Sequence, residues 1–100
     1  MPDKDRAALE ARWLELTDSL LPSCAKARHF PVYYNHCFQR IFLDNACGEV
    51  WYNSIKKRPA YKHAPDKILT CAIALAEDVY NSRADIHHLN QISLTYRNKV

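Results

Sequence analysis

Apolar and polar residues alternate along the first fifth of the chain with the period of a helix that buries one face. The apolar positions lie three or four residues apart and are Leu9, Trp13, Leu16 and Leu20. This spacing predicts an amphipathic helix from about Asp5 to Leu21 that packs its apolar stripe on another element. We expect Pro22 to end this helix, because proline lacks an amide hydrogen and its ring clashes with the preceding turn.

The stretch Pro31 to Ile55, PVYYNHCFQRIFLDNACGEVWYNSI, is apolar on almost every side when it is wound as a helix. Such a helix must be enclosed by other elements, so we predict a central helix over about residues 32–55, with Pro31 at its first position. Gly48 inside it costs about 1 kcal/mol relative to alanine. Either another backbone approaches closely at Gly48, or the helix kinks or breaks there.

Two further helices follow a short loop. The first is predicted over about 66–80, and the second over about 83–97, where Ser82 and Asp85 resemble a capping box. The core-facing residues of the last helix are expected to be Ile86, Leu89, Ile92 and Tyr96. No stretch alternates with the period of a strand. The pattern predicts a single all-α domain over residues 1–100, a compact bundle of four or five helices around the central one.

Composition supports an ordinary globular protein. The chain has 100 residues, of which 48% are hydrophobic and 25% charged, and this excludes the disordered class. No apolar run is long enough to span a bilayer, and the charged N-terminal stretch is unlike a signal peptide. We therefore expect a cytoplasmic protein with no membrane contact. Its four cysteines should be reduced and pack as small apolar residues: Cys24, Cys37, Cys47 and Cys71.

Several polar residues fall at positions that the pattern assigns to the core. Arg40 and Asp44 lie four residues apart and are expected to pair along the central helix, with Asn45 beside them. Asn90 and Arg97 come from the last helix. One interpretation is a ligand pocket in which arginine holds an anion while Asp44 and Asn45 orient the ligand or act on a proton. The other is a buried polar network that fixes the register of the helices.

The loop from 56 to 65, KKRPAYKHAP, is basic. Its predicted nucleic-acid-binding residues are Lys56, Lys57, Arg58 and Lys62. Trp51, Tyr52 and Tyr61 are interleaved with them, and cations beside aromatic rings are typical of surfaces that bind single strands or RNA. The alternative is a solvated loop whose tyrosine packs on the core. The net charge of +3 permits a polyanionic partner without requiring one.

Metal chemistry has little support in the sequence. His36 and Cys37 are adjacent, so on a helix they point about 100° apart, and no Cys-x-x-Cys or His-x-x-x-His pair occurs. We predict no metal and no cofactor. The Tyr33–Tyr34 pair suggests instead a contact surface for a protein partner or a second copy of the chain. Trp13 is assigned to the core by its spacing.

Three strings, CFQRIFLDNACGEVW, RPAYKH and LNQISLTYR, resemble a pattern of small microbial all-α proteins that have no established activity. The resemblance therefore implies no catalytic residue. It implies that six residues lie together in space and form the candidate ligand site: Arg40, Asp44, Asn45, Tyr61, Asn90 and Arg97.

The working hypothesis is a small, non-enzymatic binding or regulatory module. It would contact a partner or a polyanion through the basic loop and the polar residues beside Arg40. The alternative is a small-molecule site for an anionic ligand, binding or catalytic, around Arg40, Asp44 and Asn45.

Overall fold

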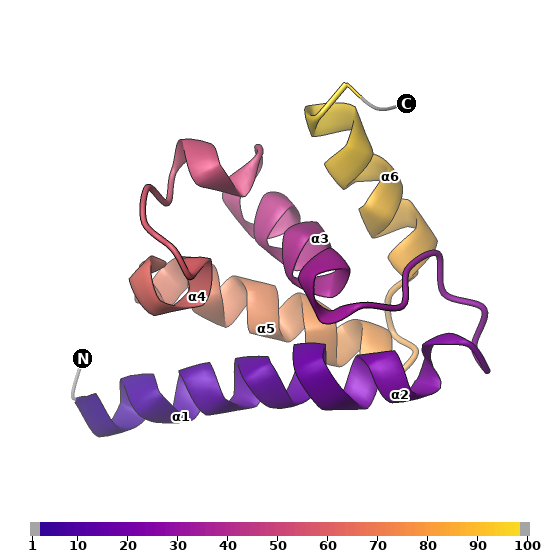
Figure 1. Cartoon of the computed structure of the whole chain (residues 1–100), viewed down its shortest axis with the longest axis horizontal. Helices are drawn as coiled ribbons and strands as arrows, with labels where there is room; N and C mark the ends of the chain where they lie inside the picture. Colours follow the sequence, from indigo (N-terminus) through magenta and orange to yellow (C-terminus); the bar gives the residue numbers. More distant parts are fainter. Residues whose placement is uncertain (1–2, 99–100) are drawn as a thin grey trace.

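The computed structural model describes residues 3–98, and all the regular elements in this range are helices (Figure 1). They are α1 (Asp3–Leu14), a π-helical segment (Glu15–Leu20), α2 (Leu21–Ala25), α3 (Asn35–Cys47), a 3₁₀ turn (Trp51–Asn53), α4 (Ala60–His63), α5 (Asp66–Tyr80) and α6 (Ile86–Tyr96). The predicted all-α bundle is confirmed. Its radius of gyration, 12.8 Å, is that of a compact chain of this size.

The helices pack in a simple order (Figure 1). α1 and α5 lie side by side, α3 crosses above α5, and α6 leans on α3 away from α1. α3 therefore is the central helix, as predicted. It packs against both α5 and α6.

The core is aromatic at its centre. Trp13 is fully buried, as predicted, and meets Phe42 edge to face with ring centroids 6.4 Å apart. Phe38 stacks on Phe42 at 6.4 Å, and Phe30 meets Phe38 at 6.1 Å. These rings join the long N-terminal helix to α3, and aromatic pairs of this geometry add to the free energy of burial.

The first helix does not end at Pro22, and that prediction is wrong. It continues through a π-helical segment into α2, with Pro22 in the first turn of α2. The amide of Leu21 donates to the carbonyl of Leu16, five residues back rather than four. This wider turn precedes the proline, and an early position in a new helical register is one that proline tolerates.

The central helix is shorter than the predicted 32–55. Pro31 lies outside it, and Tyr34, in an extended conformation, precedes its first residue. Gly48 ends it in the left-handed region at φ +72°, and its amide donates to the carbonyl of Asp44 at 2.9 Å. The predicted break at Gly48 is confirmed, whereas the close backbone approach is wrong, because a Cβ there would meet no atom within 4 Å.

α5 has the predicted bounds, but α6 begins later than predicted. Asp85 caps α6 by accepting a hydrogen bond from the His87 amide at 2.9 Å, and Ser82 lies in the preceding turn at φ +61°. Ser82 therefore is not the cap. Tyr96 was expected in the core and is 37% exposed; Ile86 and Ser93 are the buried residues of α6.

Two other expectations concern the cysteines and the membrane. All four cysteines are free thiols, but Cys71 is exposed, so its assignment to the core is wrong. Cys47 is half-buried, and burial, followed by the nearby Asp44 and Glu49 carboxylates, raises the pKa of its thiol. None of the helices described between residues 3 and 98 has the length and apolar character to cross a membrane.

Candidate anion-binding site beside a polar seam

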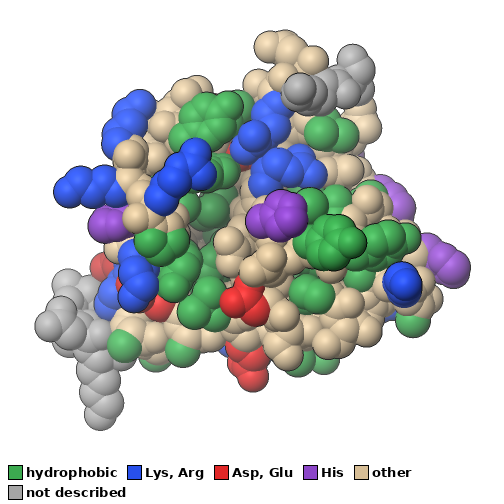
Figure 2. All heavy atoms as spheres, viewed as in Figure 1, with side chains coloured by type: hydrophobic (Ala, Val, Ile, Leu, Met, Phe, Trp, Pro, Cys, Tyr) green, Lys and Arg blue, Asp and Glu red, His purple; other side chains and the backbone are tan. Residues whose placement is uncertain are grey.

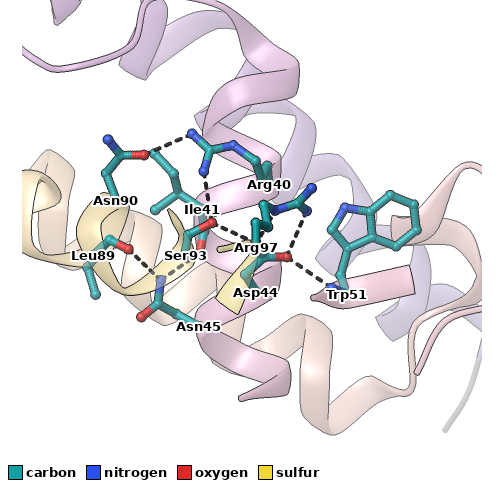
Figure 3. Close-up of polar contacts among 9 residues, drawn as sticks. All are labelled: Arg40, Ile41, Asp44, Asn45, Trp51, Leu89, Asn90, Ser93 and Arg97. Carbon is teal, nitrogen blue, oxygen red and sulfur yellow. Dashed lines mark hydrogen bonds and ion pairs between the residues drawn. The ribbon is translucent and has the colours of Figure 1, made fainter. Parts of the chain in front are cut away.

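A buried carboxylate joins α3 to α6 (Figure 3). Asp44 is fully buried, and one of its oxygens accepts hydrogen bonds from Ser93 Oγ at 2.6 Å and Arg97 Nε at 2.8 Å. The other oxygen accepts from the backbone amide of Trp51 at 2.9 Å and from Arg97 Nη2 at 3.1 Å. Asp44 thus holds three segments together, because a buried charge is tolerated only where it is paired and hydrogen-bonded.

The predicted ion pair between Arg40 and Asp44 does not form. Arg40 points across to α6 and donates to Ser93 Oγ and Asn90 Oδ1, both at 2.8 Å. Asp44 pairs with Arg97 instead. The Ser93 hydroxyl, which accepts from Arg40 and donates to Asp44, is therefore the link between the two residues.

Ser93 was missed by the sequence interpretation. It is fully buried, although the residues around it suggested a different core face for α6. A signal was present: Asn90, Ser93 and Arg97 recur at i, i+3 and i+7 and therefore share one face of a helix. We call Arg40, Asp44, Asn45, Asn90, Ser93 and Arg97 the polar seam.

Asn45 acts within the seam as a structural residue. Its amide nitrogen donates to the carbonyls of Ile41, at 2.8 Å, and Leu89, at 3.0 Å. Both hydrogens of that nitrogen are used, so they are not offered to a ligand. These contacts favour the network interpretation for Asn45 and Asp44.

The seam carries more positive than negative charge. It contains two guanidinium groups and one carboxylate: Asp44 pairs with Arg97, and Arg40 donates only to neutral oxygens. Burial lowers the pKa of Arg40, and repulsion from Arg97 lowers it further. Arginine nevertheless stays protonated at neutral pH. Arg40 is thus a half-buried cation with no carboxylate partner among the described side chains.

A pocket of about 230 Å³ opens beside Arg40, between α3 and the segment that carries the 3₁₀ turn and α4. Its lining residues are His36, Gln39, Arg40, Leu43, Trp51, Arg58, Pro59 and Ala60. We call it the basic pocket, because Arg40 and Arg58 line it and no Asp or Glu does. Figure 2 shows Lys and Arg side chains gathered around a hollow in the upper part of this face.

The basic pocket joins the two surfaces that the sequence suggested separately. Arg40 comes from the polar seam, whereas Arg58 comes from the basic loop and lies over the Trp51 ring, 4.9 Å from its centroid. Arg97 lies over the neighbouring Tyr52 ring at 5.5 Å. The sequence alone did not predict that Arg40 and Arg58 line one pocket, because they lie on different elements. Only the turn after Gly48 brings them together.

Two residues named by the sequence interpretation lie elsewhere. Tyr61 and Lys62 are on α4, which packs on α1. The Tyr61 carbonyl accepts from Arg6 at 2.8 Å, and Lys62 Nζ lies 3.9 Å from the Glu10 carboxylate. Neither residue lines the basic pocket. Lys56 and Lys57 are exposed on the loop just before Arg58.

The Tyr33–Tyr34 pair is at the surface, 46% and 67% exposed, and Tyr34 stacks on His36 at the edge of the basic pocket. Its role as a partner surface stays a prediction. Within the described part of the chain, no three or more His, Cys, Asp or Glu side chains are grouped so that they could hold a metal ion.

Neither a protein-family model, nor a curated protein, nor a solved structure matches this chain significantly.

Proposed function

We propose that this protein is a non-enzymatic binding module that holds an anionic group in the basic pocket. The observation that supports this is the pairing state of the two arginines that line it. Four of the other five arginines pair with a carboxylate, as Arg6 does with Asp66, and the fifth, Arg28, donates to two backbone carbonyls. Arg40 and Arg58 have none among the described side chains, and a guanidinium fork matches the geometry of a carboxylate or phosphate.

The size of the pocket limits the ligand. Sites for drug-sized ligands enclose roughly 300–1,000 Å³, and the basic pocket has about 230 Å³. It therefore suits a phosphate or carboxylate group with a small attached portion. His36 and Gln39 add polar atoms to the wall, while Leu43 and Trp51 make the rest of it apolar.

A binding role is favoured over catalysis by the state of the nearest carboxylate. Asp44 is fully buried and both of its oxygens accept hydrogen bonds, three of them from cationic or backbone donors. A general base needs a free lone pair within reach of the substrate proton. Asp44 is thus suited to holding Arg97 and Trp51 in place rather than to moving a proton.

The test is a thermal-unfolding titration with inorganic phosphate and with methyl phosphate at constant ionic strength. A ligand that binds the folded state raises the melting temperature as its concentration exceeds the dissociation constant. We expect a saturable rise for the native protein and its loss in Arg58→Gln. Lys26→Gln, which removes the same charge from an exposed residue outside the pocket, should respond like the native protein.

A rise that is equal in all three proteins would mean general salt stabilisation, and no rise in any of them would mean no anion site. Either result contradicts the proposal. Arg58 is exposed, so its replacement should leave the fold intact.

A further inference from the structure

We propose that the anion is a backbone phosphate of a single-stranded nucleic acid, which lies across the basic pocket and the adjoining segment Trp51–Arg58. This rests on the proposed function, because it names the source of the anionic group. Three features of the described residues support a single strand: the stacking surfaces beside the pocket, the distribution of unpaired cations, and the small size of the concavity.

The first feature is a pair of aromatic rings, of which Trp51 lines the pocket and Tyr52 follows it in the chain. Trp51 and Tyr52 meet edge to face with centroids 5.6 Å apart, and Tyr52 is 47% exposed. Arg58 lies over Trp51 and Arg97 lies over Tyr52. Unstacked bases bind on aromatic faces and on guanidinium planes. The surface therefore offers stacking positions directly beside the cations that would hold a phosphate.

The second feature is the distribution of charge. Between residues 35 and 63 there are five Lys or Arg residues and two carboxylates. Asp44 is buried in the seam, and Glu49 accepts hydrogen bonds from Ser54 Oγ at 2.7 Å and Asn53 Nδ2 at 3.4 Å. Of the five basic residues, Lys62 alone approaches a carboxylate, that of Glu10.

The remaining four cations belong to the pocket wall or to the loop segment directly before Arg58. They are Arg40 and Arg58 in the pocket wall and Lys56 and Lys57 on the loop beside it. Cations that flank a central anion site suit a ligand with charges repeated along a chain. A single small anion would leave Lys56 and Lys57 without a role.

The third feature is the shape of the site, which favours a single strand over a duplex. A volume of about 230 Å³ has room for one phosphate group with a small attached portion. The adjacent rings need a base whose face is free, and in a duplex the faces of the bases are stacked on one another. We therefore expect a short site, of a few nucleotides, with little dependence on sequence.

The experiment measures fluorescence anisotropy of end-labelled six-residue single strands, of uridine and of deoxythymidine, against the full chain. We expect saturable binding that weakens steeply with salt, about 0.7 in the log–log slope for each phosphate contact. Arg58→Gln should weaken binding roughly tenfold or more, because it removes a phosphate contact and a stacking plane. Lys26→Gln is the charge-matched control and should change the affinity little.

A second readout reports stacking itself. Trp13 and Trp51 are the two tryptophans, and the buried Trp13 Nε1 has no hydrogen-bond partner, so Trp13→Phe should leave Trp51 as the sole reporter in a folded chain. A strand that stacks there should quench its fluorescence, whereas inorganic phosphate should not. Tyr52→Leu should weaken strand binding several-fold and leave phosphate binding unchanged. If Trp13→Phe does not fold, the anisotropy titration of Tyr52→Leu is the test of stacking: an affinity for the strands equal to that of the native protein would contradict it.

The outcomes separate this inference from the proposed function. If phosphate binds in an Arg58-dependent way but the strands bind no more tightly than methyl phosphate, the nucleic-acid inference fails and the anion-binding module stands. If a duplex of equal length binds as tightly as the strands, the single-strand preference is wrong. If neither phosphate nor strand binds, both proposals fail.

Discussion

The Ser93 hydroxyl forms hydrogen bonds with two charged side chains, those of Arg40 and Asp44. It accepts from Arg40 and donates to Asp44, so a neutral group separates a cation from a carboxylate that would otherwise be expected to pair. This arrangement leaves Asp44 to Arg97 and keeps Arg40 at the wall of the basic pocket. At the scale of the residue, the ligand site and the structural network thus share Arg40.

Replacing Ser93 by alanine should destabilise the protein by about 1–3 kcal/mol, because Arg40 Nη1 loses its acceptor and the buried Asp44 oxygen keeps only the Arg97 donor. Thr95→Ala is the matched control on the same helix, since the Thr95 hydroxyl is exposed and bonds only the Gln91 carbonyl. Its effect should stay within about 0.5 kcal/mol. Urea unfolding followed by circular dichroism measures the free energy of unfolding of both variants. Equal losses of stability would contradict the role of the Ser93 hydroxyl as the link between Arg40 and Asp44.

At the scale of the element, the C-terminal end of α3 determines the position of Trp51. Gly48 turns the chain out of the helix, and the amides of Gly48 and Glu49 both donate to the Asp44 carbonyl, at 2.9 and 3.3 Å. The chain then returns so that the Trp51 amide reaches the Asp44 carboxylate. One residue, Asp44, therefore ends the helix through its backbone and positions Trp51 through its side chain.

Gly48→Ala should cost roughly 1–2 kcal/mol, because an L-residue with a Cβ is strained at positive φ. Contacts should add nothing to this cost, since the space around the new Cβ is empty within 4 Å. Gly48→Asn should cost less, as asparagine tolerates the left-handed region better than alanine does. The free energies of unfolding in urea provide the test, and an alanine variant as stable as the native protein would refute it.

At the scale of the whole molecule, the bundle has a strongly buried part and a more weakly held helix. α5 buries five residues, all of them apolar, whereas α6 buries Ile86 and Ser93. α6 packs mainly on α3, and much of that interface is the polar seam. Since hydrophobic burial is the larger contribution to stability, α6 should open more easily than the rest.

Hydrogen exchange followed by mass spectrometry should show amides of α6 exchanging before those of α5 under native conditions. The physical reason is that local opening of α6 exposes little apolar surface, while opening of α5 disrupts the core. Asp44→Asn should accelerate exchange in α6 more than in α1, because it weakens the pair with Arg97. Equal protection of α5 and α6 would show instead that the bundle opens as one unit.

The fold class could be predicted because it depends on local patterns. Periodicity identified α5 with its observed bounds, assigned Trp13 to the core, and indicated a central helix. Its errors in the bounds of the elements fell at helix ends. Pro22 was expected to stop a helix that a π-helical turn carries onward, and Ser82 was expected to cap α6, whose cap is Asp85. Local sequence preferences do not determine which backbone hydrogen bonds form at a helix end, so they do not fix where the helix begins or ends.

The sequence by itself indicated that Arg40, Asp44 and Asn45 lie at least partly in the interior, since their helix must be enclosed, but it did not indicate that Thr17 and Ser93 are fully buried. Tertiary structure decided the partners of these polar residues. Helix spacing allowed Arg40 to reach Asp44, but α6 brings Arg97 and Ser93 close enough to compete, and a buried carboxylate takes the partners that satisfy both of its oxygens. Only the turn at Gly48 placed Arg58 and Trp51 opposite Arg40, and so created the basic pocket.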